Sequence, residues 1–392
     1  MEKLGRRQLL AGAGAAAFLG ALPGCVASLG TKREATLSVL QLAPVRATPD
    51  RITRITVCTR PFRAQGPRLD AERIGTKLIV HNYGHGGSGW SLSWGSSAIA
   101  VERAMATGQR DVAVVGCGAL GMTSALLLQR AGARVVIYAK DLPPNVRSSL
   151  ATGVWSPDSR ICLEDHASPV FRALWATMAR RSFQTYQTLL GLPGNPVEFI
   201  DNYVVTDVAA SVRASATNGD GRPRFAALHH DLGGEFATAA EDFAPGTHPF
   251  GARALRRRSL MMFNIAAYSR MLMTDFLLAG GQIEVAEFHS PAEFARLRQR
   301  TVINATGYGA RTLFGDRTLT PVRGQLARTV PEPGIGYGLM YRDVAFVPRR
   351  DGFVFQVLGD SDYYGYDDDS TTPDRAEAEL AVNTIAGLFA AA

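Results

Sequence analysis

The chain has 392 residues, of which 46% are apolar, and a formal net charge of +7 at pH 7. This size suffices for one large or two medium domains, and a charged fraction of 20% argues against wholesale disorder. The longest basic run, residues 256–258, is short and has no interleaved aromatic residues, which argues against nucleic-acid binding. The four cysteines form no C-x-x-C pair, so we expect neither a zinc or redox motif nor a structural disulfide.

Residues 1–25 have the features of a bacterial export signal. Arg6 and Arg7 precede an apolar stretch, residues 9–22, that is too short and too rich in alanine and glycine for a convincing transmembrane helix. Twin arginines in this position indicate Tat export, and the tetrapeptide LPGC, which ends at Cys25, resembles a lipobox. We therefore expect the protein in the cell envelope or periplasm, either anchored as a lipoprotein at Cys25 or released by cleavage of a plain signal peptide.

The hydrophobic pattern predicts the elements of the remaining chain. After a linker over residues 26–50, we expect strands at 54–60 and 76–80, a helix at 89–103, a buried parallel strand at 111–115, a helix at 119–131 and a strand at 134–138. Further on, we expect helices at 170–190, 268–279 and 376–391, a strand at 301–304, and several short strands between 319 and 358. This mixture predicts an α/β nucleotide-binding domain that is interleaved with a mostly antiparallel β domain.

Residues 116–121 (GCGALG) have the G-x-G-x-x-G pattern between a predicted strand and a predicted helix, which is the context of a dinucleotide-binding loop. Gly116 would make the tight turn, Gly118 would let the backbone approach a pyrophosphate, and Gly121 would let helix and strand pack closely. The N-terminus of the following helix would offer free N–H groups to phosphate.

The adenosine end of this predicted site departs from the usual pattern. An acidic residue is expected at the end of the second strand to bind the ribose. Lys140 occupies that position, and Asp141 follows it. Either Asp141 binds the ribose from a shifted position, or Lys140 and backbone groups replace the acid.

Several further segments resemble the signature sequences of the D-amino-acid oxidase family. They are the glycine loop HNYGHGGSG (residues 81–89) with Trp94 and Gly95, the segment SSLATGVW (148–155), NATG (304–307), P-x-RGQ (321–325) and the arginine–proline turn at Arg60. The resemblance implies FAD as the cofactor. It also implies a Rossmann-like FAD-binding domain interleaved with a mostly antiparallel β substrate domain.

The order of these segments differs from the order in the family. There the nucleotide loop comes first, and the arginine turn and glycine loop come last; here these two precede it, with a joint near residues 107–110. This is the order expected of a circular permutation, which is physically acceptable because domain termini often lie close together. The C-terminus would then lie close to the start of the strand at 54–60.

The resemblance implies a division of the chain into alternating parts. We expect the FAD-binding domain at residues 51–163 and 251–320 and the substrate domain at 164–250 and 321–392.

The resemblance also implies the reaction, which is oxidative deamination of a D-amino acid with hydride transfer from the α carbon to the flavin and reduction of oxygen to hydrogen peroxide. It implies Arg60 as the partner of the substrate carboxylate, a role that suits the planar guanidinium fork, and Gly87 as the carbonyl that meets the substrate amine. The family's carboxylate-binding tyrosine aligns with Ala345. Tyr341 could substitute for it, or the carboxylate could be held more weakly.

Other residues are implied as cofactor contacts. They are Gly84, Gly86, Gly87, Ser88, Gly89, Trp90, Ser91, Gly116, Cys117, Gly118, Ala119, Leu120, Gly121, Lys140, Ser148, Ser149, Ala151, Gly153, Val154, Trp155, Phe288, Thr306 and Gly307. The helix that begins near Gly89 would direct its partial positive charge at the flavin. His81 and His85 are interpreted as structural, because hydride transfer needs no general base there.

Other interpretations remain open at this point. One is an envelope dehydrogenase that passes electrons to a non-oxygen acceptor, and another is a flavin-binding protein without amine oxidation. The acidic run at residues 360–369 is interpreted as a solvated loop and not as a metal site. The expected partners are an amino acid or amine and an electron acceptor, with no nucleic acid and no metal.

Overall fold

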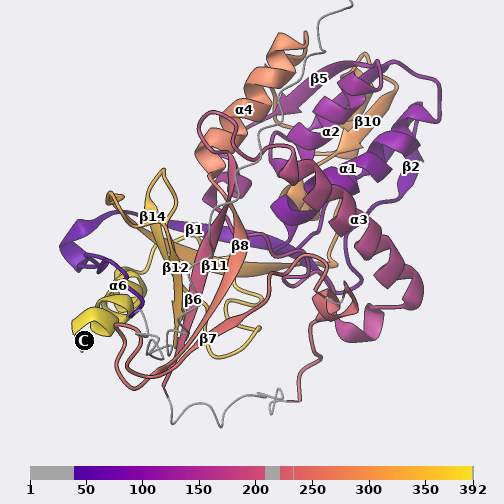
Figure 1. Cartoon of the computed structure of the whole chain (residues 1–392). Coiled ribbons are helices and arrows are strands. Elements are labelled where there is room, and N and C mark those ends of the chain that lie inside the picture. The colour runs from indigo at the N-terminus through magenta and orange to yellow at the C-terminus, as the bar shows by residue number, and fades with distance from the viewer. Residues whose placement is uncertain (1–38, 208–220, 233, 391–392) are drawn as a thin grey trace, which may run out of the picture. The chain divides into compact units, whose positions relative to one another are not determined.

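The computed structural model describes residues 39–207, 221–232 and 234–390, and the expected export signal with Cys25 lies outside them. Two β-sheets form the framework of the described residues, and helices cover them (Figure 1). None of the described helices is long and apolar enough to cross a membrane.

The first sheet has six strands in the order β2-β3-β10-β4-β5-β9 and is parallel except for β2. Its strands are β2 (Ala71–Ile74), β3 (Lys77–His81), β10 (Thr301–Asn304), β4 (Asp111–Val115), β5 (Arg134–Ala139) and β9 (Gln282–Val285). β10 lies between β3 and β4, so the loops that follow these three strands start from the same edge of the sheet. In open parallel sheets this carboxyl edge is where ligands bind.

The helices are α1 (Gly89–Met105), α2 (Ala119–Arg130), α3 (Pro169–Gln187), α4 (Ile265–Leu278), the short α5 (Ala310–Leu313) and α6 (Arg375–Ala390). Short 3₁₀ turns are η1 (Pro49–Arg51), η2 (Arg147–Leu150), η3 (Glu164–His166), η5 (Leu228–Leu232), η6 (Pro291–Arg296) and η7 (Gly307–Gly309). Side chains of α1, α2 and α4 share one buried core with β4 and β5. Local signals explain two helix ends. Ser168 caps the start of α3 by accepting from the Phe171 N–H at 3.2 Å, and Gly132, with a φ of +82°, follows the end of α2.

The second sheet has eight strands in the order β1-β11-β14-β13-β12-β6-β8-β7 and is antiparallel except for the β12–β6 pair. Its strands are β1 (Ile52–Arg63), β11 (Leu319–Thr329), β14 (Phe353–Val357), β13 (Val344–Val347), β12 (Gly338–Tyr341), β6 (Val197–Thr206), β8 (Ala254–Phe263) and β7 (Glu241–Phe243). A core of Phe346, Phe353, Val382 and Ile385, among others, joins this sheet to α6. The start of α6 also reaches the chain before β1, where Arg375 Nη2 donates to the Pro49 carbonyl at 3.0 Å.

The predicted α/β class with a second, mostly antiparallel sheet is confirmed, and the predicted elements are present with ends shifted by a few residues. The strong pair β6–β8 was not predicted. Its strand β8 contains the basic run, in which Arg256 pairs with Asp242 and Arg257 with Asp201 and Glu241 on neighbouring strands. The arginines of β8 are neutralised by acidic residues on neighbouring strands, so the sequence of β8 alone does not show the alternation of apolar and polar residues that predicts a strand.

The expected division into parts needs a correction at two strands. β1 and β8 fall within the segments that we assigned to the FAD-binding domain, yet both lie in the eight-stranded sheet. A hydrophobic pattern identifies a strand but not the sheet that it joins.

Candidate functional site

A cavity of about 1250 Å³ opens at the carboxyl edge of the six-stranded sheet and extends to the eight-stranded sheet. It is lined by the glycine loop, the nucleotide loop, residues of the 145–160 segment, and Met340, Ala345 and Gln356 of the second sheet. Sites for small molecules typically measure roughly 300–1,000 Å³, so this cavity has room for a large cofactor and a substrate together.

The nucleotide loop has the geometry that its glycines predict. Gly116 has a φ of +108°, and a β-carbon there would lie 2.5 Å from the Ala305 carbonyl oxygen. A β-carbon on Gly121 would lie 2.0 Å from the Gly116 carbonyl oxygen, so this glycine allows α2 to pack on the turn. α2 begins at Ala119 without a side-chain cap, and its first residues line the cavity. This helix end therefore has the geometry expected of a site for a pyrophosphate.

Ser148 joins three of the predicted cofactor segments. Its carbonyl oxygen accepts from Trp90 Nε1 at 2.8 Å, and its hydroxyl oxygen accepts from the Ala119 N–H at 3.1 Å. The starts of α1 and α2 therefore meet at η2, although they come from distant parts of the sequence. Both helix N-termini face the same cavity.

The glycine loop is pressed against the turn at Ser159 and Arg160. Gly86 has a φ of +55°, and a β-carbon there would lie 1.9 Å from the Arg160 carbonyl oxygen. The Gly87 N–H donates to the Ser159 carbonyl at 2.9 Å, and the Gly86 N–H donates to the Pro61 carbonyl at 2.9 Å. Glycine is required at position 86 both by the backbone angle and by the close approach.

His85 is buried in the wall of the cavity. Its Nε2 contacts the Ser96 hydroxyl at 2.7 Å, and that hydroxyl donates to Asn82 Oδ1 at 2.6 Å, so Nε2 carries the proton. Its Nδ1 is buried without a hydrogen-bond partner among the described residues. Burial lowers the pKa of His85 to about 3, because the charged form would lose its hydration, and the ring is neutral at ordinary pH.

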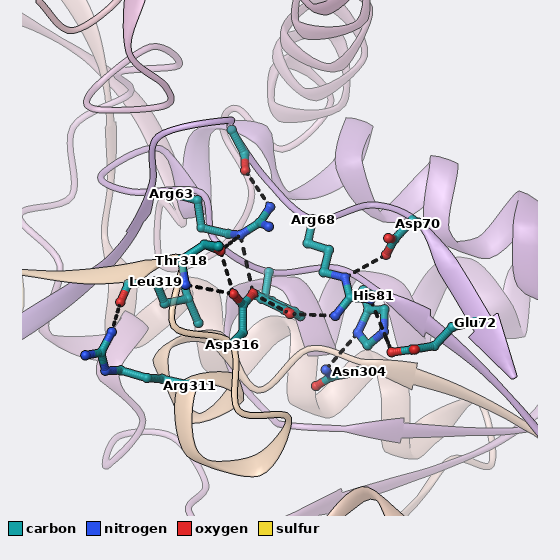
Figure 2. Close-up of polar contacts among 12 residues, drawn as sticks. Arg63, Arg68, Asp70, Glu72, His81, Asn304, Arg311, Asp316, Thr318 and Leu319 are labelled. Carbon is teal, nitrogen blue, oxygen red and sulfur yellow. Dashed lines mark hydrogen bonds and ion pairs between the residues drawn. The ribbon is translucent and has the colours of Figure 1, made fainter. Parts of the chain in front are cut away.

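His81 has a different environment, shown in Figure 2. Its Nε2 lies 2.8 Å from Glu72 Oε1, and its Nδ1 lies 3.1 Å from the Asn304 side-chain nitrogen. Burial lowers its pKa, with the charge of Arg68 acting in the same direction. His81 is not part of the cavity lining, and it connects β3 to β10. These contacts support the structural interpretation of both histidines.

A polar network holds the chain on either side of the glycine loop (Figure 2). Arg68 pairs with Asp70 and Glu72, and Asp316 pairs with Arg63 at 3.4 Å and accepts from the Tyr83 hydroxyl at 2.8 Å. The network thus links the end of β1 and the glycine loop to the chain after α5. These contacts position the loop without entering the cavity.

Arg60 and Arg160 both line the cavity beside the glycine loop. Arg60 Nη1 donates to the Arg323 carbonyl at 3.2 Å, and among the described residues Arg60 has no ion pair with a carboxylate. Arg160 Nε donates to the Asp362 carbonyl at 2.6 Å. Burial lowers the pKa of both guanidinium groups, that of Arg160 to about 10. Arginine side chains keep their charge at neutral pH in proteins.

Arg349 was missed by the sequence analysis because a lone arginine after a proline carries no recognisable pattern. It is fully buried, pairs with Asp351 at 2.8 Å (Nε to Oδ1), and donates from Nη1 to the Ala151 carbonyl at 2.6 Å. On the neighbouring strand β14, Gln356 Oε1 accepts from the Thr152 hydroxyl at 2.5 Å. The second sheet therefore fixes residues 151–152 against the cavity through two side chains.

At the opposite end of the cavity, Lys140 forms an ion pair with Glu287 at 3.2 Å. Asp141 and Phe288 line the same region. Glu287, on the chain after β9, is an acidic residue that the sequence pattern could not place at the end of β5. It is a second candidate, besides Asp141, for binding a ribose hydroxyl.

Most of the residues expected to contact the cofactor line this cavity. They are Gly86, Gly87, Gly89, Trp90, Ser91, Gly116, Cys117, Gly118, Ala119, Leu120, Lys140, Ser148, Ala151, Gly153, Val154, Phe288, Thr306 and Gly307. Five lie behind the lining: Gly84, Ser88, Gly121, Ser149 and Trp155. Gly121 supports the loop from behind, as described above.

Tyr341 requires a correction. Its hydroxyl contacts the two carboxylate oxygens of Asp207 at 3.1 and 3.3 Å, and the residue belongs to the buried core of the eight-stranded sheet instead of the cavity lining. Alternation along β12 is the reason: Met340 faces the cavity, so its neighbour points to the other face. Ala345 lines the cavity, so no tyrosine replaces the family's tyrosine from β12 or β13.

The chain is similar in sequence to one family of known proteins. Residues 111–391 match the family described as DAO, FAD dependent oxidoreductase. A D-amino-acid oxidase of Streptomyces coelicolor is 28% identical over 71% of this chain and 77% of its own length. A D-amino-acid oxidase of Rubrobacter xylanophilus is 27% identical over 70% and 76%. Among solved structures, iminodiacetate oxidase from Chelativorans sp. BNC1 is 16% identical over 71% of this chain and 79% of that chain, with a TM-score of 0.49.

Three observations indicate that the cavity fits FAD. The uncapped start of α2, with Gly116 and Gly118, suits the pyrophosphate, and the start of α1, also without a side-chain cap, suits an electron-rich ring system. The buried Nδ1 of His85 is an acceptor without a protein partner in the described chain. When bound, FAD supplies the redox chemistry, and the protein supplies binding and orientation.

Proposed function

The chain belongs to the DAO family of FAD-dependent oxidoreductases, and from this premise we propose that it uses FAD to oxidise the amine of a D-amino acid. The proposed acceptor is oxygen, which yields an imino acid and hydrogen peroxide, and water then releases ammonia from the imino acid. The names of the two bacterial relatives support the choice of D-amino acids as substrates. Because these relatives are only 28% and 27% identical to this chain, the proposal rests mainly on the residues of the cavity.

The observation that carries the proposal is the position of Arg60. Its guanidinium is a cation without a carboxylate partner in the described chain, and it lines the cavity together with Gly87. A buried cation of this kind is stabilised when a ligand supplies the missing anion. We assign the α-carboxylate of the substrate to Arg60 and the substrate ammonium or amine to the carbonyl oxygen of Gly87. These two contacts would orient the α carbon toward the flavin. The flavin would lie between the start of α1 and residues 151–154.

The alanine at position 345 leaves the cavity wider at the place where the family has a tyrosine. Met340 and Val347 line the neighbouring wall. The substrate carboxylate would thus be held mainly by charge, through arginine, and less by a hydroxyl. We expect a site that excludes water less tightly but binds anions strongly.

We also propose that the chain is a circular permutant of its family. The family match begins at residue 111, at the start of β4, and leaves β1, β3 and α1 before it. The glycine loop that precedes α1 nevertheless lines the same cavity as the nucleotide loop. Leu388 and Phe389, at the end of α6, belong to the same hydrophobic core as Val45 and Ile52, which supports short reconnection of the termini.

The permutation has a direct test. A rearranged chain that begins at residue 111, runs to residue 390 and continues through a short glycine–serine linker into residues 51–106 restores the family order. We expect it to fold and to bind FAD as the original chain does. A rearranged chain that is soluble but binds no FAD would contradict the permutation.

Location in the cell envelope remains a proposal that rests on residues 1–25. Replacing Arg6 and Arg7 with lysine should leave the protein in the cytoplasmic fraction. Replacing Cys25 with serine should release it from membranes if it is a lipoprotein. Export that is unchanged by the double lysine variant would contradict the Tat assignment.

The proposed activity is tested with the purified holoenzyme by following oxygen consumption and peroxide release with D- and L-amino acids, glycine and N-methyl amino acids. We expect turnover with at least one D-amino acid and little with its L enantiomer. Turnover with an artificial electron-accepting dye but not with oxygen would assign a dehydrogenase. No turnover with any acceptor would overturn the proposed function.

A further inference from the structure

Arg60 and Arg160 lie on two sides of the same glycine loop. Pro61, which follows Arg60, accepts the Gly86 N–H at 2.9 Å, and the carbonyl oxygen of Arg160 sits where the β-carbon of residue 86 would be. Both residues line the cavity. The backbone next to Arg60 and the backbone of Arg160 are thus packed on the same glycine, and the charge of Arg60 acts on Arg160.

The backbone of Arg160 is held in an unusual conformation. Its φ is +48°, in the left-handed region that non-glycine residues rarely adopt. Such a conformation is strained and persists where the surrounding structure requires it. Here the contact with Gly86 fixes the backbone, and the side chain is only 14% exposed.

The protein neutralises Arg160 only weakly. The nearest carboxylate oxygen, Asp362 Oδ1, lies 3.8 Å from Nη2, and the Asp362 side chain is 70% exposed, so solvent screens this pair. Asp360 also lines the cavity, but it has no ion pair with either arginine among the described residues. Burial, and after it the neighbouring charge of Arg60, lower the pKa of Arg160 to about 10, with Asp362 acting in the opposite direction. Two cations that disfavour each other therefore share one cavity.

The nucleotide does not explain both charges. The pyrophosphate site at α2 is formed by the nucleotide loop and Ser148, whereas Arg60 and Arg160 lie beside Gly86 and Gly87. A third arginine of the lining, Arg147, lies over the ring of Tyr308 at 5.1 Å, next to the segment expected to contact the cofactor. The pair Arg60 and Arg160 is thus left for the substrate.

We propose that the substrate is an amino dicarboxylate, an amino acid with a second carboxylate in its side chain, such as D-aspartate or D-glutamate. This inference rests on the proposed function and deepens it. Arg60 binds the α-carboxylate, and Arg160 binds the side-chain carboxylate and so determines specificity. The wide wall at Ala345 admits the longer side chain. Arg60 then gains an anion that the described chain does not provide, and Arg160 gains a closer one than the exposed Asp362 carboxylate.

A comparison of charged substrates with their neutral amides tests the preference for a side-chain carboxylate. Steady-state kinetics with D-aspartate, D-glutamate, D-asparagine, D-glutamine and D-alanine separate charge from shape, because each acid and its amide have nearly the same size. We expect kcat/KM for the preferred acid to exceed that for its amide by roughly 10- to 100-fold, as a charge-assisted contact in a partly buried site provides. Arg160→Gln should lower kcat/KM for the preferred acid far more than kcat/KM for its amide or for D-alanine, and Arg160→Lys should restore part of the preference for the acid. Arg134→Gln, an arginine that is 78% exposed on β5, is the matched control.

A binding measurement makes the test independent of turnover and of variant folding. Malonate and succinate should perturb the visible spectrum of the wild-type holoenzyme at lower concentrations than acetate and propionate. Equal kcat/KM for acids and amides, or turnover of neutral D-amino acids alone, would overturn this inference and leave the proposed function standing. No turnover with any amino acid of the panel would overturn both. Equal loss of acid and D-alanine turnover in Arg160→Gln, with FAD content unchanged, would show that Arg160 does not determine specificity.

Discussion

A β-carbon on Gly324 would lie 2.5 Å from Nη2 of Arg60. The two residues face each other across the antiparallel pair β1–β11, where Arg60 is in register with Val322 and its guanidinium extends over residue 324. Strand β11 can hold the guanidinium in this position only because residue 324 has no side chain. The arginine–proline turn and the RGQ segment, which are far apart in the sequence, therefore form one functional unit.

This relationship predicts that Gly324→Ala displaces the Arg60 guanidinium, since the flexible end of the arginine moves more easily than the strand. We expect KM for the substrate to rise on the order of 10- to 100-fold, because a small misplacement of a substrate-binding group has such an effect. The thermal midpoint should change little. The control is Gly336→Ala, where a β-carbon meets open space. Steady-state kinetics and thermal unfolding check both variants. An unchanged KM in Gly324→Ala would contradict the idea that Gly324 positions Arg60 for substrate binding.

Arg60→Ala tests the carboxylate role itself. Removing the cation should weaken substrate binding by roughly 2–5 kcal/mol, because a buried charge-assisted contact is lost. FAD content should be retained, since Arg60 is not part of the nucleotide loop. The same assay on Arg134→Gln serves as the control. A KM within twofold of the wild-type value would remove Arg60 from the site.

Gly86→Ala should be more damaging than its backbone angle alone explains. Gly86 and Gly75 have nearly the same φ, +55° and +58°, but a β-carbon on Gly75 meets nothing within 4 Å. Gly75→Ala should therefore cost only the left-handed strain, about 1–2 kcal/mol of unfolding free energy. Gly86→Ala must in addition move the Arg160 carbonyl, and we expect loss of bound FAD. Denaturant unfolding and the flavin absorbance per protein distinguish the two variants. Equal unfolding free energies and equal FAD content would contradict the close packing of Gly86 against the Arg160 carbonyl.

His85 makes a pH prediction. Burial lowers the pKa of folded His85 to about 3, below the ordinary histidine value of 6.5 that applies in the unfolded chain. A depressed pKa contributes stability that is present above the unfolded value and is lost as pH falls toward the folded value, because the unfolded state takes up the proton first. The unfolding free energy of the wild type should therefore decrease from about pH 6.5 downward more steeply than that of His85→Gln. Parallel curves for the two proteins would argue against a buried neutral imidazole.

The same state of His85 predicts the shape of the pH–rate profile. A ring that stays neutral above its folded pKa cannot act as a titrating base between pH 5 and 9. The inflections of kcat/KM in that range should thus be the same in wild type and His85→Gln, provided that FAD remains bound. Loss of an inflection in the variant would assign His85 a role in proton transfer.

Much of the site could be predicted because it depends on backbone geometry. Gly116, Gly121 and Gly86 are required by close backbone approaches, and such positions leave a readable pattern in the sequence. The strand and helices that present them, β4, α2 and α1, are largely buried, and their apolar segments can be recognised in the sequence. The cavity that they form was therefore foreseeable in its main parts.

Side-chain contributions from the second sheet could not be predicted in this way. Arg349 and Gln356 act through contacts with residues about two hundred positions earlier in the chain. Arg160 lines the cavity because of a single left-handed residue, which no periodic pattern indicates. Tyr341 was misplaced by one position along a strand, and one position moves a side chain to the opposite face.

We propose that the glycine loop and the nucleotide loop form one FAD site that oxidises a D-amino acid. The most direct test is anaerobic mixing of the purified holoenzyme with single D- and L-amino acids while the visible absorbance of bound FAD is followed. We expect loss of that absorbance with at least one D-amino acid, most strongly with an acidic one, and its retention with the L enantiomer. Retention of the absorbance with every amino acid would contradict an amino-acid-oxidising site.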